Sequence, residues 1–244
     1  MTSSSAIAVL GLTKRFGDHT AVDNATFEVP FGAVTGFIGA NGSGKTTTMR
    51  SIVGLTIPTS GRVLVDGVPY RSLPDPRRSV GCALDRLGAH PGLTGRQHLT
   101  IVATSARIEP HTVAPALELV GLTDAADRRV GSYSTGMKQR LALAVALIAE
   151  PRILILDEPA RGLDPAGIRW LRRLLRREAD RGRAVFVSTH QLAELASIVD
   201  RVVFIDQGRV LADEGTADLL EHTRQETLED AVFALTGTTE DEVQ

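Results

Sequence analysis

The sequence predicts an α/β fold with a mainly parallel sheet, and two observations predict it. First, three short apolar runs have the length and composition of buried strands: Val34–Ile38, Ile153–Leu156 and Ala184–Val187. Second, each run is followed by a turn or a helix-start signal, and helical stretches lie between the runs. Such alternation is typical of a parallel sheet that is covered by helices.

Other segments complete the predicted domain. Val63–Val65, turning at Asp66-Gly67, and Val202–Ile205, turning at Gln207-Gly208, are predicted hairpin strands at the edges. The N-terminal portion is predicted to be rich in β-structure, whereas helical patterning dominates between about residues 86 and 149. We therefore expect one domain over residues 6–237, with a helical subdomain of about 86–149 inserted in the α/β core. The ends, 1–5 and 238–244, are expected to be flexible.

Composition excludes several classes of protein. The 244 residues are 43% hydrophobic and 23% charged, which are ordinary globular values, and a net charge of -2 gives no reason to expect a nucleic-acid partner. The single cysteine, Cys82, excludes an intramolecular disulfide and favours the cytoplasm. The longest apolar run, Leu141–Ala149, is far shorter than the ~20 residues of a spanning helix, and the start lacks the basic region of a signal peptide.

A phosphate-binding loop follows the first predicted strand. Gly39-Ala40-Asn41-Gly42-Ser43-Gly44-Lys45-Thr46 fits G-x-x-x-x-G-K-[ST] between a strand and a helix, which is the context that this motif requires. Glycines let backbone N–H groups approach the phosphates, lysine adds a mobile charge, and a threonine hydroxyl suits Mg²⁺. The alternative is a chance match. The candidate nucleotide-binding residues here are Asn41, Gly42, Ser43, Gly44, Lys45, Thr46 and Thr47, and Thr46 is also a candidate metal ligand.

A pair of acids ends the predicted strand Ile153–Leu156. Asp157 and Glu158 would face the crevice at the carboxyl end of a parallel sheet, where α/β proteins bind ligands. Asp157 is placed to hold Mg²⁺ through its water shell, and Glu158 could polarise an attacking water as a general base. The alternative is two solvated acids in a turn, which a chain with a phosphate loop makes less favoured.

Five motifs in order resemble those of ATP-binding cassette (ABC) ATPases. Tyr133-Ser134-Thr135-Gly136-Met137-Lys138-Gln139-Arg140-Leu141 resembles the family's signature sequence, with Thr-Gly-Met where Gly-Gly-Gln is commonest. It follows the phosphate loop and precedes the acid pair, and Gly162-Leu163-Asp164-Pro165 and Ser188-Thr189-His190 come after. The resemblance extends from Leu10 to about Gly237. It implies a P-loop NTPase core with an N-terminal antiparallel β subdomain and an inserted helical subdomain.

The resemblance implies a composite site. In the family, the signature binds the γ-phosphate of ATP held by the other subunit, so two copies or two related chains would clamp two MgATP molecules head to tail. The residues concerned here are Ser134, Thr135, Gly136 and Met137. An ordinary helix cap is the alternative for Ser134, since it precedes an apolar helix.

Three further positions carry over from the family. Phe16 falls where the family stacks an aromatic ring on adenine, with core packing as the alternative. Asp164 matches an aspartate that crosses to the partner subunit, although a loop cap would also suit it. His190 matches the histidine that contacts the γ-phosphate and fixes the attacking water. Lys45, Glu158 and His190 are thus the candidate catalytic residues.

Two positions depart from the family's pattern. Asp85 aligns with a glutamine that reaches Mg²⁺ and the attacking water, and is therefore a candidate metal ligand that is shorter and charged. Arg161 stands where a small or amide side chain is more usual.

Together these features predict the ATP-binding subunit of an ABC transporter, peripheral on the inner face of the cell membrane, with transmembrane permease subunits on separate chains. The signature and the segment Leu228–Gly237 resemble those of drug and antibiotic exporters. The alternatives are a soluble ABC ATPase acting on ribosomes or DNA, and a catalytically silent regulatory module.

Overall fold

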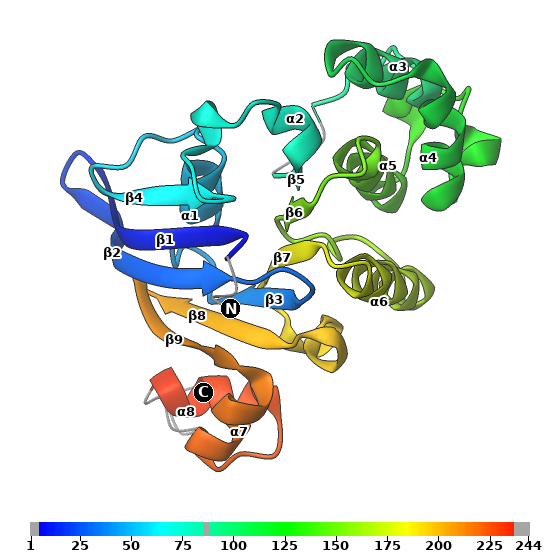
Figure 1. Cartoon of the computed structure of the whole chain (residues 1–244). Coiled ribbons are helices and arrows are strands. Elements are labelled where there is room, and N and C mark those ends of the chain that lie inside the picture. The colour runs from blue at the N-terminus through cyan, green and yellow to red at the C-terminus, as the bar shows by residue number, and fades with distance from the viewer. Residues whose placement is uncertain (1–4, 85–87, 237–244) are drawn as a thin grey trace.

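The computed structural model describes residues 5–84 and 88–236 (Figure 1). The strands are β1 (Ile7–Phe16), β2 (His19–Val29), β3 (Val34–Ile38), β4 (Ser60–Val65), β5 (Val80–Ala83), β6 (Ile153–Leu156), β7 (Ala184–Thr189), β8 (Arg201–Asp206) and β9 (Arg209–Gly215). The α-helices are α1 (Lys45–Ile52), α2 (Pro76–Ser79), α3 (Gly95–Ser105), α4 (Val113–Leu119), α5 (Thr135–Leu147), α6 (Pro165–Asp180), α7 (Thr216–Thr223) and α8 (Leu228–Thr236).

The central sheet has six strands in the order β5-β6-β7-β3-β8-β9, and only β9 runs antiparallel to its neighbour. This confirms the predicted mainly parallel sheet. Its inner strands are apolar on both sides because both faces are covered. On β7, Phe186 points into one core cluster, whereas Val185 and Val187 point into the other.

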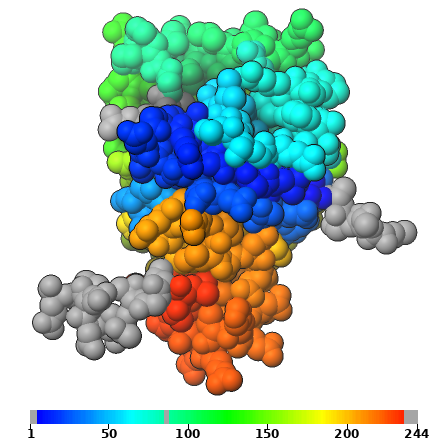
Figure 2. All heavy atoms as spheres, turned by 90° about the vertical axis from the view of Figure 1, so that its left-hand side faces the viewer, coloured from blue at the N-terminus to red at the C-terminus, as the bar shows by residue number. Residues whose placement is uncertain are grey.

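A three-stranded antiparallel sheet, in the order β2-β1-β4, covers one face of the central sheet together with α1. The shared core includes Met49 of α1 and three aromatic rings, Phe27, Phe37 and Phe186, whose centroids lie 5.1 to 5.7 Å apart. Figure 2 shows these blue N-terminal strands lying between the green helical region and the orange strands β8 and β9.

The opposite face of the sheet carries α5 and α6. Helices α3, α4 and α5 lie between β5 and β6 in the chain and gather beside the edge of the sheet (Figure 1). Gly81 permits this arrangement, because a Cβ atom there would collide with the carbonyl of Ala146 on α5. Helix α3 begins with a capping box in which Thr94 and Gln97 bond each other's backbone N–H groups.

Two details differ from the sequence-based expectations. Asp66-Gly67 forms a turn, but only Val65 and Val68 pair across it, and β4 finds its partner in β1 instead. The hairpin at Gln207-Gly208 is present, although β8 is an inner strand and β9 is the edge. Across residues 5–84 and 88–236, the helices are all too short or too polar to span a bilayer.

Candidate functional site

The phosphate loop joins β3 to α1 and has a backbone that requires glycine. Gly42 and Gly44 have φ angles of +84° and +105°, and a Cβ atom on Gly44 would lie 2.5 Å from the carbonyl oxygen of Ala21. The Ser43 hydroxyl is buried and has no hydrogen-bond partner among the residues that the structure describes. A buried polar group is costly to leave unpaired, and a polar ligand on this loop would satisfy the Ser43 hydroxyl.

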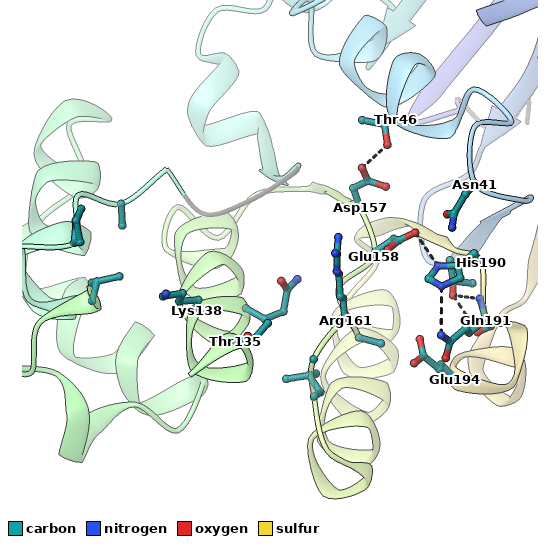
Figure 3. A pocket seen from close by; sticks show the side chains of 18 of the residues that line it. Asn41, Thr46, Thr135, Lys138, Asp157, Glu158, Arg161, His190, Gln191 and Glu194 are labelled. Carbon is teal, nitrogen blue, oxygen red and sulfur yellow. Dashed lines mark hydrogen bonds and ion pairs between the residues drawn. The ribbon is translucent and has the colours of Figure 1, made fainter. Parts of the chain in front are cut away.

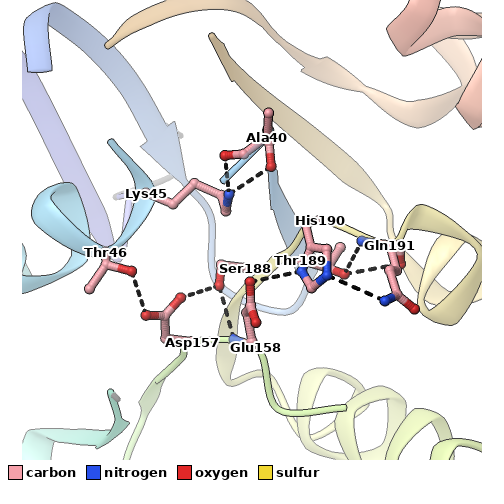
Figure 4. Close-up of polar contacts among 10 residues, drawn as sticks. Ala40, Lys45, Thr46, Asp157, Glu158, Ser188, Thr189, His190 and Gln191 are labelled. Atoms are coloured by element: carbon pink, nitrogen blue, oxygen red, sulfur yellow. Dashed lines mark hydrogen bonds and ion pairs between the residues drawn. The ribbon is translucent and has the colours of Figure 1, made fainter. Parts of the chain in front are cut away.

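Lys45 begins α1 and folds back over the loop. Its ammonium group donates hydrogen bonds to the carbonyl oxygens of Gly39 at 2.6 Å and Ala40 at 2.8 Å (Figure 4). Burial lowers the pKa of Lys45, while the nearby carboxylates of Glu158 and Asp157 oppose that shift. The lysine therefore forms a desolvated cation beside the two acids.

Asp157 connects three elements at the carboxyl end of the sheet. One of its oxygens accepts a hydrogen bond from the Thr46 hydroxyl at 2.8 Å, and the other accepts one from the Ser188 hydroxyl (Figure 4). Ser188 also accepts the backbone N–H of Glu158 at 3.0 Å. These contacts bring α1, β6 and β7 together, as parallel strand ends at one edge of a sheet predict.

Glu158 is held in a strained backbone conformation, with a φ angle of +46° that a residue with a side chain rarely adopts. Its carboxylate lies 2.8 Å from Nδ1 of His190. The Nε2 atom of His190 lies 3.3 Å from the side-chain Nε2 atom of Gln191. The Glu158 side chain is 23% exposed and that of His190 is 35% exposed. The pair is thus fixed in place and open to solvent.

A hollow of about 1220 Å³ extends from this corner to the start of α5 (Figure 3). Its lining residues are Asn41, Thr46, Ala89, Pro91, Val130, Gly131, Thr135, Lys138, Gln139, Asp157, Glu158, Ala160, Arg161, Gly162, Leu163, Thr189, His190, Gln191 and Glu194. Burial, and to a smaller extent the charge of Glu158, raises the pKa of Glu194 against the opposing influence of His190.

The signature segment lies on the far side of the hollow. Ser134 caps α5, and its hydroxyl accepts the backbone N–H of Met137 at 3.2 Å. Gly136 approaches the next loop closely, because a Cβ atom there would lie 3.0 Å from the carbonyl oxygen of Gly162. The cap predicted for Ser134 is therefore present, and Thr135 faces the hollow as part of its lining.

The remaining candidates are spread over the molecule. Phe16 is 52% exposed with the ammonium of Lys14 4.8 Å from its ring centroid, so core packing is wrong for this residue. Asp164 caps α6 by accepting the N–H of Gly167 at 2.7 Å, as the loop-cap alternative predicted. Thr47 is partly buried in the first turn of α1. Asp85 lies outside the described residues.

Sequence reasoning left several residues of the hollow without a role. Ser188, which lies next to the lining residue Thr189, belongs to the motif Ser188-Thr189-His190, but its bridge between Asp157 and Glu158 depends on β6 and β7 being neighbours in the sheet. Gln191 and Glu194 lie in the segment that follows β7, so polar residues after a strand end were the available signal. Lys138 lies within the signature and Arg161 in the loop before Gly162-Leu163-Asp164, and the sequence assigns a function to neither.

The family match and the similar proteins of known sequence agree with each other. Residues 22–161 match the ABC transporter family. The bacitracin transport ATP-binding protein BcrA of Bacillus licheniformis is 39% identical over 86% of this chain and 70% of its own length. The lantibiotic transport ATP-binding protein SrtF of Streptococcus pyogenes is 34% identical over 85% of this chain and 90% of its own.

Solved structures agree with the sequence relatives. The structure of an ATP-binding subunit of an ABC transporter superimposes with a TM-score of 0.87 at 28% identity, over 95% of this chain and 100% of that one. The chain therefore belongs to the ABC transporter family. It is an ATP-binding subunit, an ATPase whose turnover is coupled to transport.

Proposed function

We propose that this chain is the ATPase subunit of an exporter, and that it works as a head-to-tail dimer beneath separate transmembrane permease subunits. The observation that best supports ATP hydrolysis is the contact between Glu158 and His190, which lies in the hollow beside the phosphate loop. The printed functions of the relatives, bacitracin and lantibiotic transport, support export of an antibiotic-type compound. The second subunit is a copy of this chain or a related one, and both lie on the cytoplasmic face of the cell membrane.

ATP would place its phosphates on the loop from Asn41 to Thr47. The buried, unpartnered hydroxyl of Ser43 supports this placement. The ammonium group of Lys45 donates to two carbonyl oxygens of its own loop in this structure, and it would donate to the terminal phosphates instead when ATP binds. Phe16 is exposed and free to stack on the adenine ring.

The side chains beside the loop fit Mg²⁺. Thr46 and Asp157 offer oxygen atoms 2.8 Å apart, which is the donor type that this hard cation prefers. When bound, Mg²⁺ supplies neutralising charge to the terminal phosphates. Asp85 remains a proposed third ligand.

Hydrolysis would proceed by direct attack of water on the γ-phosphorus. Glu158 accepts a proton from the water, whose oxygen bonds to phosphorus while the bond to the ADP oxygen breaks. His190 holds the Glu158 carboxylate in place and, with Lys45, stabilises the developing negative charge. No covalent intermediate with the protein is formed.

The dimer completes each site from two chains. The segment Ser134–Met137 of one subunit would bind the terminal phosphate held by the other, because the start of α5 presents N–H groups and positive potential to an anion. Asp164 would cross to the partner subunit from its position at the start of α6.

The test of the proposed chemistry is Glu158→Gln in the purified full chain. Turnover, measured as phosphate release, should fall by at least about 100-fold, because general base catalysis contributes on that order. ATP affinity should be retained. Glu194→Gln is the matched control, since Glu194 lines the same hollow, and it should leave turnover within about threefold of wild type. Near-normal turnover of Glu158→Gln would remove Glu158 from the base role.

Export is tested separately. The membrane protein that co-purifies with this chain would be reconstituted with it in inside-out vesicles. The proposal expects bacitracin to accumulate inside them when ATP is added outside. Co-purification of ribosomal RNA without a membrane protein would favour a soluble ABC ATPase instead.

A further inference from the structure

Arg161 is an exposed arginine that lines the hollow. Among the residues that the structure describes, none forms a hydrogen bond or ion pair with its side chain. A guanidinium group is charged at every accessible pH, so an unpaired one beside a catalytic corner is available to an anionic ligand.

The backbone fixes where Arg161 stands. Its N–H donates to the carbonyl oxygen of Glu158 at 3.1 Å, which closes a turn directly after the acid pair. The next residue, Gly162, has a φ angle of +75°, and a Cβ atom there would lie 2.6 Å from Cγ2 of Thr135. The loop is therefore pressed against the start of α5, and Arg161 is held between the acid pair and that helix.

The side chain extends toward the acid pair, as Figure 3 shows, with Lys138 and Thr135 on the side of α5. The carboxylates of Asp157 and Glu158 already have partners in Thr46, Ser188 and His190. No described carboxylate forms an ion pair with Arg161 or with Lys138. The described lining is thus divided between two acids that have partners, Asp157 and Glu158, and two cations that have none among the described residues, Arg161 beside the acids and Lys138 on α5.

This division has a consequence for an anion released in the hollow. Inorganic phosphate carries one to two negative charges near neutral pH, so Asp157, Glu158 and Glu194 repel it. Arg161, beside the acids, and Lys138, on α5, attract it. The planar guanidinium also matches two phosphate oxygens at once, which an ammonium group does not.

We propose that Arg161 is a phosphate-binding residue outside the phosphate loop, and that it binds the inorganic phosphate released in this hollow. The inference rests on the proposed function for the origin of the phosphate. Arg161 forms and breaks no covalent bond in this role.

The experiment is a titration of the full-length chain with inorganic phosphate in the presence of excess ADP, followed by phosphorus NMR. Arg161→Asn should raise the dissociation constant for phosphate by about tenfold, as expected for loss of a charge-assisted hydrogen bond. Arg161→Lys keeps the charge and should recover most of the affinity. Arg173→Asn is the matched control, because Arg173 is an exposed arginine of α6 outside the lining of this hollow.

Equal phosphate affinity in the wild type and Arg161→Asn would overturn the inference. So would equal losses in Arg161→Asn and Arg173→Asn, or a wild type that binds no phosphate. Thermal melting confirms that each variant is folded. Since the titration involves no ATP turnover, it stands apart from the Glu158→Gln test. A chain without ATPase activity that still binds phosphate through Arg161 would refute only the proposed function.

Discussion

The two walls of the hollow differ in how much of their chemistry is already paired within the chain. At the strand ends, Asp157 bonds the hydroxyls of Thr46 and Ser188, and Glu158 contacts His190. The other wall consists of the start of α5 and the loop of Arg161, held together by the close approach of Thr135 and Gly162, and among the described residues neither Lys138 nor Arg161 has a partner for its charge.

This difference shows which functional groups of the site have their hydrogen-bond partners within the folded chain. The strand-end wall is stabilised by its own functional groups, so its geometry exists before a ligand binds. Under the proposed function, the groups of the α5 wall would be paired by an anion or by a second subunit. Substitutions on the first wall should therefore lower both stability and turnover, whereas substitutions on the second should lower function alone.

Asp157→Ala should have the largest effect. It removes a proposed metal ligand and leaves the hydroxyls of Thr46 and Ser188 without their acceptor. Phosphate release should become undetectable, and urea denaturation should show a loss of about 2 kcal/mol in the free energy of unfolding. Unchanged stability would contradict the view that this wall is part of the fold.

Ser134→Asp sharpens the comparison from the other side. Aspartate caps a helix as well as serine does, so the free energy of unfolding should stay within about 0.5 kcal/mol of wild type. Its charge would meet the partner's terminal phosphate, and like charges in contact are strongly unfavourable. ATP-dependent dimerisation, measured by analytical ultracentrifugation, should weaken by at least about tenfold. Normal dimerisation would leave Ser134 as a helix cap only.

Lys138→Gln tests an unpaired cation of the α5 wall. Lys138 is exposed, and exposed charges contribute little, so turnover should fall by no more than about fivefold while stability is unchanged. Phosphate release and thermal melting measure the two effects. A clear loss of stability would show that Lys138 has a structural partner and that the two walls are not distinct.

His98 gives the smallest expected effect and lies on α3, away from both walls. Burial lowers its pKa below the ordinary 6.5, so the unfolded chain binds a proton more readily than the folded chain does. The free energy of unfolding should therefore fall as pH drops through 6.5. Urea denaturation at about pH 7.5 and about pH 5.5 should show a smaller fall in His98→Gln than in wild type. An identical fall would show that His98 does not contribute.

Much of the fold was predictable because its signals are local. The strands β3 and β6 coincide with the apolar runs Val34–Ile38 and Ile153–Leu156, since a strand buried on both faces must be apolar throughout. The edge position of Val202–Ile205 was wrong because strand order depends on how distant segments pair. β9 takes the edge by turning back on β8.

The residue types of the site were also predictable, but not their partners. The acid pair contains Glu158 and the motif Ser188-Thr189-His190 contains His190, so both were candidates from the sequence. Their 2.8 Å contact, however, depends on β6 and β7 being neighbours in the sheet. Nor did the phosphate-loop motif indicate that Lys45 would bond its own loop. These are properties of tertiary packing, which spacing along the chain does not encode.

The central claim, that each nucleotide is bound by the phosphate loop of one chain and the signature of the other, has a direct test. Two double variants are prepared, Lys45→Ala with Glu158→Gln and Ser134→Asp with Glu158→Gln. Each is examined by analytical ultracentrifugation with ATP and Mg²⁺, alone and in an equal mixture. Each variant alone lacks one half of every site and should remain monomeric. The mixture contains one complete site per mixed pair and should form dimers. Dimers of either variant alone, or a mixture that stays monomeric, would contradict the head-to-tail account.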